Sequence, residues 1–327
     1  MLKKLMNHAV IDLTITPVDP LLIKSGQATV SGVDMSFVRT YKFGEKPEPF
    51  IPGSSLKGVI RSYAEKICRT LRDDPVPVCL PYVEPEKEQN GEINQAACGN
   101  RIKHFLKKSS IDSIPSSDIY RLSCPTCRTF GSHYFIGRLA TSDGYLTDDF
   151  KKTDRALLET RDGVAIDRLT GGPVGGAKYD LEVLTKGEFG TRIEIQNFER
   201  WQLGLLGLVL RDMRQELIRI GMGKSRGLGR IKAEITRFEI TYFGKPQKTL
   251  TGLASGCSDK ECMDYGLFRE TETGAILQGP ASAGLRHGYD LTGTWESALE
   301  PAVKDLTAYI ADVPWPKDID AYTKRRQ

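Results

Sequence analysis

A glycine-rich stretch, residues 221–231, constrains this chain more than any other feature. It reads GMGKSRGLGRI, and Lys224, Ser225, Arg226 and Arg230 stand among the glycines. Glycine adopts positive φ angles and lets another backbone approach closely. Basic side chains beside such a turn, with free N–H groups, suit the phosphate backbone of a nucleic acid. The stretch therefore predicts a tight turn that contacts phosphate, and a solvated hairpin is the alternative.

A nucleotide-binding P-loop can be excluded for this stretch. Gly223, Lys224 and Ser225 look like the end of the GxxxxGK[ST] pattern, but the pattern requires glycine at position 218, where Ile218 stands. A P-loop also follows a strand and opens a helix. This stretch instead follows a helical pattern and precedes a strand-like one.

The overall charge confines any nucleic-acid surface to part of the molecule. Lysine and arginine total 46 against 42 acidic residues, which gives a net charge of +4. No apolar run approaches the roughly 20 residues of a membrane-spanning helix, and the N-terminal segment lacks the apolar core of a signal peptide. We therefore expect a cytoplasmic protein without a membrane partner, whose cysteines are reduced or bind metal.

Hydrophobic periodicity predicts an α+β fold. Apolar residues alternate in some segments and recur at helical spacing in others. The predicted elements are a strand at 9–16, a helix at 56–71, strands at 133–147 and 191–198, a helix at about 199–219 and a strand at 231–243. This order is that of a ferredoxin-like core, similar to an RNA-recognition motif. We expect it within residues 1–245, followed by a partly irregular C-terminal extension, 246–327, with a short helix near 296–310.

The start of the first helix is a second candidate phosphate site. In the segment FIPGSSLKG, Ser54 or Ser55 can cap the helix. The free N–H groups of the first turn suit phosphate, with Lys57 and Arg61 nearby. A solvated charged face is the alternative. We expect this site and the glycine-rich stretch to lie on one side of the molecule.

Residues 73–130 interrupt the periodic pattern and carry the signature of a metal site. Cys124 and Cys127 form a CxxC pair, which is the half-site that two thiolates of a tetrahedral zinc site use. Two further cysteines complete the set, although Cys68 or His104 could replace the first of them. A proline- and charge-rich insertion gains order from a metal. The predicted ligands of this structural zinc are Cys79, Cys98, Cys124 and Cys127.

Four separated motifs resemble those of the RAMP superfamily of CRISPR proteins. They are IPGSSLKGVIRS, CPTCRTFGS followed by GRLATSDGYL, ETRDGVAIDRLTGG followed by KYDLEVLTKGEF, and GMGKSRGLGR. More narrowly, residues 8–243 are similar to the repeating backbone subunit of type III CRISPR effector complexes. The resemblance implies a ferredoxin-like core that binds guide RNA (crRNA), with several copies wound into a helical filament beside other effector subunits.

The resemblance also implies a β-hairpin called the thumb. In such subunits the thumb interrupts pairing between guide and target at regular intervals. Here it would occupy residues 155–190 and carry Arg161, Arg168 and Lys178.

By the same resemblance, Asp34 cleaves complementary target RNA with Mg²⁺ or Mn²⁺. The segment GVD, residues 32–34, stands where such subunits carry their catalytic aspartate, in the loop after the first strand. Lys24 and Arg39 in this loop would offset charge on the phosphate. From the residues alone, Asp34 can hold a hydrated metal ion or simply begin a turn.

Two alternative functions remain open. Some branches of the family keep the fold without the nuclease, so the chain could be a backbone subunit that only binds RNA. A related endoribonuclease, which processes precursor guide RNA on its own, generally uses histidine. The histidines are His8, His104, His133 and His287, and none stands beside the glycine-rich stretch.

Overall fold

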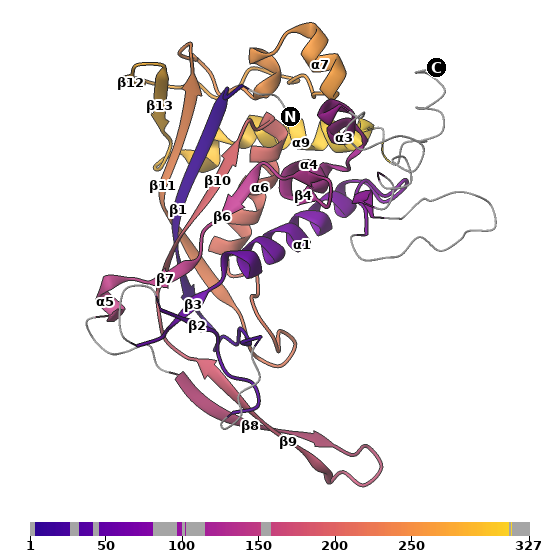
Figure 1. Ribbon diagram of the computed structural model, residues 1–327, viewed down its shortest axis with the longest axis vertical. Helices are drawn as coiled ribbons and strands as arrows, with labels where there is room; N and C mark the ends of the chain where they lie inside the picture. Colours follow the sequence, from indigo (N-terminus) through magenta and orange to yellow (C-terminus); the bar gives the residue numbers. More distant parts are fainter. Residues whose placement is uncertain are drawn as a thin grey trace, which may run out of the picture.

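The centre of the structure is an antiparallel sheet whose strands are far apart in sequence (Figure 1). The computed structural model describes residues 4–26, 33–41, 46–80, 97–99, 102, 115–151, 158–313 and 315. The core elements are β1 (Asn7–Pro17), α1 (Gly53–Leu71), β6 (Leu139–Thr141), β7 (Gly144–Leu146), β10 (Phe189–Gln196), α6 (Arg200–Arg214) and β11 (Ile231–Phe243).

The order of these strands is that of a ferredoxin-like fold. β1 lies between β11 and β10, and both β6 and β7 pair with β10 on its other side. Each helix therefore connects two strands that flank a third, as the β, α, β, β, α, β order requires. Figure 1 shows α1 and α6 on one face of the sheet. The predicted fold class is confirmed.

One face of the sheet is buried because apolar and polar side chains alternate along its strands. In β1, Ile11, Leu13 and Ile15 are buried, while Asp12 and Thr14 between them stay partly exposed. Burying each large aliphatic side chain stabilises the fold by about 1.5–3 kcal/mol. The helices cover this apolar face.

Two predicted elements have other bounds. α6 ends at Arg214 rather than near 219, because Glu216 adopts a φ of 63°, which no helix continues. Leu217, which lies within the predicted helix, is 60% exposed. The single strand predicted at 133–147 is divided into β5 (Phe135–Ile136), β6 and β7.

The first helix begins earlier than predicted and is capped differently. No serine side chain caps α1, which starts at Gly53. Instead, Asp143 in the turn between β6 and β7 accepts the Gly53 N–H at 2.7 Å. A Cβ at Gly53 would lie 2.7 Å from the Thr141 carbonyl oxygen, so the close approach of this turn requires glycine. The motifs IPGSS and ATSDGY are therefore neighbours in space.

Further helices and strands surround or extend this core. They are β2 (Arg39–Thr40), β3 (Glu48–Ile51), α3 (Ser116–Leu122), α4 (Pro125–Phe130), β4 (Gly131–Ser132), α5 (Asp148–Lys151), β8 (Leu158–Ile166), β9 (Pro173–Leu184), η2 (Leu253–Gly256), α7 (Asp259–Tyr265), β12 (Ala281–Ala283), β13 (Arg286–Asp290), α8 (Trp295–Ala298) and α9 (Glu300–Asp312). Within the described residues, none of the helices has the length and apolarity to cross a membrane.

The C-terminal extension packs onto the core. β13 pairs with β11, so the extension widens the sheet. α9 lies on α6, where Tyr309 stacks on Trp201 with ring centroids 4.2 Å apart. The fully buried Arg200 and Asp305 form an ion pair at 2.6 Å. The helix predicted near 296–310 is present as α8 and α9.

β8 and β9 form a separate two-stranded hairpin that projects from one end of the molecule (Figure 1). Asp162 pairs with Asp180 across it, and Thr160 pairs with Glu182. Most of β8 is exposed, as expected for a hairpin that does not pack onto the core. A hairpin is therefore present within residues 155–190, where we predicted the thumb, and we call it the thumb below; its role on RNA stays a prediction.

Candidate nucleic-acid interface and metal centre

The four cysteines predicted as zinc ligands come together in the structure, and we call them the metal centre. The sulfur atoms of Cys79, Cys98, Cys124 and Cys127 all lie within 4.8 Å of one another, and all four residues are buried. The Cys79 and Cys127 sulfurs are 3.6 Å apart. Tetrahedral zinc with Zn–S bonds of about 2.3 Å places its sulfurs about 3.8 Å apart. The cluster therefore fits a zinc ion.

Among the described residues, neither alternative for the fourth ligand belongs to this cluster. Cys68 is buried in α1 and lies outside the group. Burial raises its thiol pKa, as for an ordinary core cysteine. His104 lies outside the described residues. Cys79 is therefore the fourth member of the described cluster.

Two backbone N–H groups donate hydrogen bonds to cysteine sulfurs of the metal centre. Cys124 precedes α4, and its sulfur accepts the Cys127 N–H at 3.4 Å. The Cys98 sulfur accepts the Cys124 N–H at 3.2 Å. Hydrogen bonds of this kind stabilise thiolates, the form that binds a metal.

Arg61 lies against the metal centre, whereas its position in the sequence predicted a contact with RNA phosphate. Its guanidinium donates to the Cys127 sulfur at 3.3 Å, to the Gly131 carbonyl at 3.0 Å and to the Glu65 carboxylate at 3.0 Å. Burial alone would lower the Arg61 pKa, but Cys127 and Glu65 outweigh it and raise the pKa. RNA contact at Arg61 stays a prediction, and no local sequence signal indicated its place beside sulfur.

A small apolar cluster joins the thumb to two loops. Leu22, Val183 and Leu228 are buried together, with Met35 and Leu181 packed against them. These residues come from the loop after β1, from β9 and from the glycine-rich loop. We call this junction the thumb base, defined as residues 20–25, 33–39, 178–184 and 219–230.

The glycine-rich loop needs its glycines for close backbone contacts. Gly221 and Gly229 have φ angles of 79° and 87°. A Cβ would lie 2.1 Å from the Leu22 carbonyl oxygen at Gly221, and 2.2 Å from the Ile220 carbonyl oxygen at Gly229. The Met222 N–H donates to the same Leu22 carbonyl at 2.8 Å. The loop is thereby held against the segment that follows β1.

The basic residues of this loop divide into two groups. Lys224, Ser225 and Arg226 are exposed. Partial burial lowers the pKa of Lys224, and the nearby charge of Lys66 on α1 lowers it further. Arg230 instead forms a two-pronged ion pair with Asp19, at 3.1 and 3.2 Å. Its charge is already balanced within the protein.

Arg226 connects the glycine-rich loop to the thumb. Its guanidinium donates to the Tyr179 hydroxyl at 2.9 Å. The Tyr179 ring lies over Gly163 of β8, where a Cβ would be 2.3 Å from the ring. The contact orients an exposed cation beside an aromatic ring, an arrangement that suits nucleic acid.

Asp34 lies at the thumb base, beside two other carboxylates. It is exposed, and its Oδ2 accepts the Asp180 N–H at 3.1 Å. The pKa of Asp180 is raised, first by its hydrogen bond with Asp162 and then by partial burial and the charge of Asp34, among others. Within the described parts of the chain, only the cysteines gather three or more ligand atoms closely enough for a metal. Asp34 therefore offers one carboxylate rather than a complete metal site.

The other predicted RNA-binding residues have varied surroundings. Arg39 pairs with Glu182, and Lys178 pairs with Asp162 at 3.3 Å. Lys57 is half-buried near the start of α1, where the Asp143 carboxylate accepts the first N–H of the helix. Of the remaining predicted residues, Lys24, Ser54 and Arg168 are exposed, and Ser55 is half-buried. The N-terminal end of α1 points toward the end of the molecule that carries the thumb (Figure 1).

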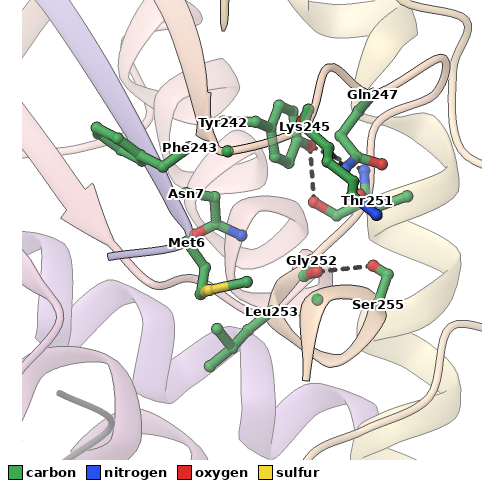
Figure 2. Close-up of a pocket in the computed structure, with 12 residues that line it drawn as sticks. Met6, Asn7, Tyr242, Phe243, Lys245, Gln247, Thr251, Gly252, Leu253 and Ser255 are labelled. Carbon is green, nitrogen blue, oxygen red and sulfur yellow. Dashed lines mark hydrogen bonds between the residues drawn. The ribbon is translucent and has the colours of Figure 1, made fainter. Parts of the chain in front are cut away.

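A cavity of about 390 Å³ lies elsewhere, between the start of β1, the end of β11 and η2 (Figure 2). Two hydrogen bonds join polar groups of its wall: the Tyr242 hydroxyl donates to the Thr251 carbonyl at 2.7 Å, and Ser255 donates to the Gly252 carbonyl at 2.8 Å.

Comparison with known protein families agrees with the fold and the motifs. The sequence model of the RAMP superfamily matches residues 14–232. That span runs from within β1 to the start of β11 and includes the thumb and the glycine-rich loop. No curated protein sequence matches the chain.

Proposed function

Because the chain belongs to the RAMP superfamily, we propose that it is a backbone subunit of a type III CRISPR ribonucleoprotein. In this role it binds guide RNA and cleaves complementary target RNA, with Asp34 as the catalytic residue. Membership of the superfamily implies a CRISPR-associated RNA-binding role. The subunit type, the filament of several copies and the cleavage activity are the proposal.

The observation that carries the proposal is the thumb base. One apolar cluster holds together the Asp34 segment, the thumb and the glycine-rich loop, although they are far apart in sequence. Exposed Lys224 and Arg226 lie on that loop. A protein that must bind a strand, displace a nucleotide and cut beside it needs these three functions close together.

The proposed cleavage uses the displaced nucleotide. A-form stacking prevents the 2′-oxygen, the phosphorus and the leaving 5′-oxygen from lying in line. A thumb that displaces one target nucleotide frees the backbone to reach that geometry. The Asp180 N–H orients the Asp34 carboxylate. Mg²⁺ commonly binds through one or two carboxylates together with substrate phosphates, and when bound it would neutralise charge on the scissile phosphate.

The metal centre has a structural role in this proposal. Four thiolates fill a tetrahedral zinc site and leave no open position for a substrate. The centre joins Cys79, which follows α1, to Cys124 and Cys127 around α4. Zinc would therefore order the insertion rather than take part in cleavage.

The RNA-binding half of the proposal is tested by purifying the chain with its co-expressed partners and sequencing the bound RNA. We expect the bound RNA to be CRISPR guide RNA. Recovery of the chain free of RNA would contradict the proposal.

The cleavage half is tested by Asp34→Ala in the assembled complex with Mg²⁺. We expect loss of cleavage with target binding unchanged, because a carboxylate near phosphate does not favour binding. Asp264→Asn, which alters an exposed carboxylate on α7, is the control and should cleave like wild type.

A backbone subunit that only binds RNA is the second candidate. The observation behind it is that the exposed Asp34 carboxylate accepts the Asp180 N–H, a structural role that requires no metal. No cleavage by wild type under the same conditions would establish it. The described histidines, His8, His133 and His287, all lie outside the thumb base, and His104 lies outside the described residues.

A further inference from the structure

Glu182 of β9 binds the segment that carries Asp34. Its Oε2 accepts the Phe37 N–H at 2.8 Å and the Arg39 Nη1 at 2.9 Å, and its Oε1 accepts the Arg39 Nη2 at 2.5 Å. One carboxylate therefore accepts three hydrogen bonds, two from a guanidinium and one from the backbone. Charge-assisted and two-pronged hydrogen bonds are the strongest that side chains make.

Backbone hydrogen bonds continue the same attachment toward Asp34. The Met35 N–H donates to the Asp180 carbonyl at 3.1 Å, and the Glu182 N–H donates to the Met35 carbonyl at 3.0 Å. The segment thus lies along β9 like a short additional strand. Asp34 stands at its start, with its carboxylate on the Asp180 N–H.

We infer that Glu182, through Arg39, is a positioning residue that fixes Asp34 relative to the thumb. This inference rests on the proposed function, since it concerns the cleavage that we assign to Asp34. Arg39 then acts within the protein rather than on phosphate.

The surroundings of the pair support this role. The Glu182 side chain is 16% exposed and that of Arg39 is 31% exposed, so solvent screens the ion pair less than at an open surface. Partial burial alone would raise the Glu182 pKa, but the hydrogen bonds from Arg39 and the Phe37 N–H outweigh it and lower the pKa. Glu182 is therefore ionised at neutral pH and holds both partners.

The consequence concerns where the target is cut. The thumb selects the displaced nucleotide, and the Glu182 attachment sets where Asp34 stands beside it. Loosening the attachment should leave target binding intact, while the carboxylate samples several positions. A misplacement of about 1 Å can lower a rate on the order of 100-fold.

The test compares Glu182→Ala with Glu159→Ala in the assembled complex. Glu159 lies on the other strand of the same hairpin, and its carboxylate pairs with Arg161 rather than with the Asp34 segment. We expect Glu182→Ala to lower the cleavage rate constant at saturating target about 10- to 100-fold, with target affinity within twofold and cleavage spread over neighbouring positions. Glu182→Gln, which keeps an acceptor for the Phe37 N–H, should recover part of the rate. Glu159→Ala should match wild type.

Failure of the inference and failure of the proposed function give different results. If Asp34→Ala is inactive and Glu182→Ala cleaves like Glu159→Ala, the positioning role is wrong and the proposed function stands. If Asp34→Ala cleaves like wild type, both are wrong. Should Glu182→Ala unfold, Arg39→Ala removes the attachment from the other side and carries the same expectations.

Discussion

The metal centre and the thumb base are built in opposite ways. The metal centre is buried, and its four candidate ligands are all cysteines. Two of them form a CxxC pair that is recognisable in the sequence. The thumb base combines buried, half-buried and exposed residues, and it joins four segments through an apolar cluster and a few polar contacts. A site whose ligands are all of one residue type can be recognised in the sequence. A site formed by contacts between distant segments can be recognised only in the folded structure.

The largest effect should follow loss of a metal-centre ligand. Cys127→Ser leaves three thiolates in a buried site, and structural zinc contributes roughly 10–16 kcal/mol of binding free energy in isolated zinc fingers. We expect less than about half an equivalent of zinc and a loss of at least about 3 kcal/mol in unfolding free energy. Metal analysis and denaturant titration measure both.

The control for the metal centre is Cys257→Ser. Cys257 is half-buried and lies outside the cluster, so the variant should keep its zinc. Equal zinc content in wild type and Cys127→Ser would remove Cys127 from the site.

A smaller loss of stability should follow Gly229→Ala in the thumb base. The added Cβ would lie 2.2 Å from the Ile220 carbonyl oxygen, and the residue also needs a positive φ. Gly227→Ala meets the same φ requirement, at 78°, without any atom within 4 Å. We expect a cost of about 1–2 kcal/mol for Gly227→Ala from φ alone and a clearly greater cost for Gly229→Ala. Equal costs in thermal unfolding would show that backbone approach does not shape the loop.

RNA affinity should respond to the exposed cations of the glycine-rich loop. Lys224→Ala with Arg226→Ala removes two proposed phosphate contacts, so affinity should fall for all sequences alike. The slope of log affinity against log salt should shrink by about 1.4, at about 0.7 per contact on single strands. Lys260→Ala with Arg269→Ala, at the distant α7 region, is the control. If the loop variant binds guide RNA like this control, the loop is not the phosphate site.

The smallest expected effect is the pH dependence of the Glu182 attachment. Because the pKa of Glu182 is lowered in the folded protein, its contribution to stability is fully present above about pH 4.5 and is lost as pH falls through the folded pKa. Wild type should exceed Glu182→Gln by no more than about 1 kcal/mol at neutral pH. The difference should shrink below pH 4.5, and acid loss of zinc affects both proteins alike. A difference that grows in acid would contradict the lowered pKa.

The sequence predicted what local patterns encode. Alternation in β1 and the two helical stripes predicted the ferredoxin-like order, and the CxxC pair indicated the metal centre. The family motifs, rather than periodicity, predicted the thumb.

The rest depends on contacts that no local pattern contains. Glu182 and Arg39 are 143 positions apart, and Asp143 reaches the start of α1 across 90 positions. The predicted serine cap failed because another segment supplies the acceptor. Arg61 looked like a helix-surface cation until the fold placed cysteine sulfur beside it.

The most direct test of the central claim is a cleavage assay with Asp34→Asn. This variant keeps the shape of the side chain and its acceptor for the Asp180 N–H but removes the charge. Assembled wild-type and variant complexes are incubated with complementary target RNA and Mg²⁺, and fragments and target binding are measured together. We expect regularly spaced fragments from wild type only, with equal target binding by both. Equal cleavage by the two complexes would contradict the assignment of Asp34.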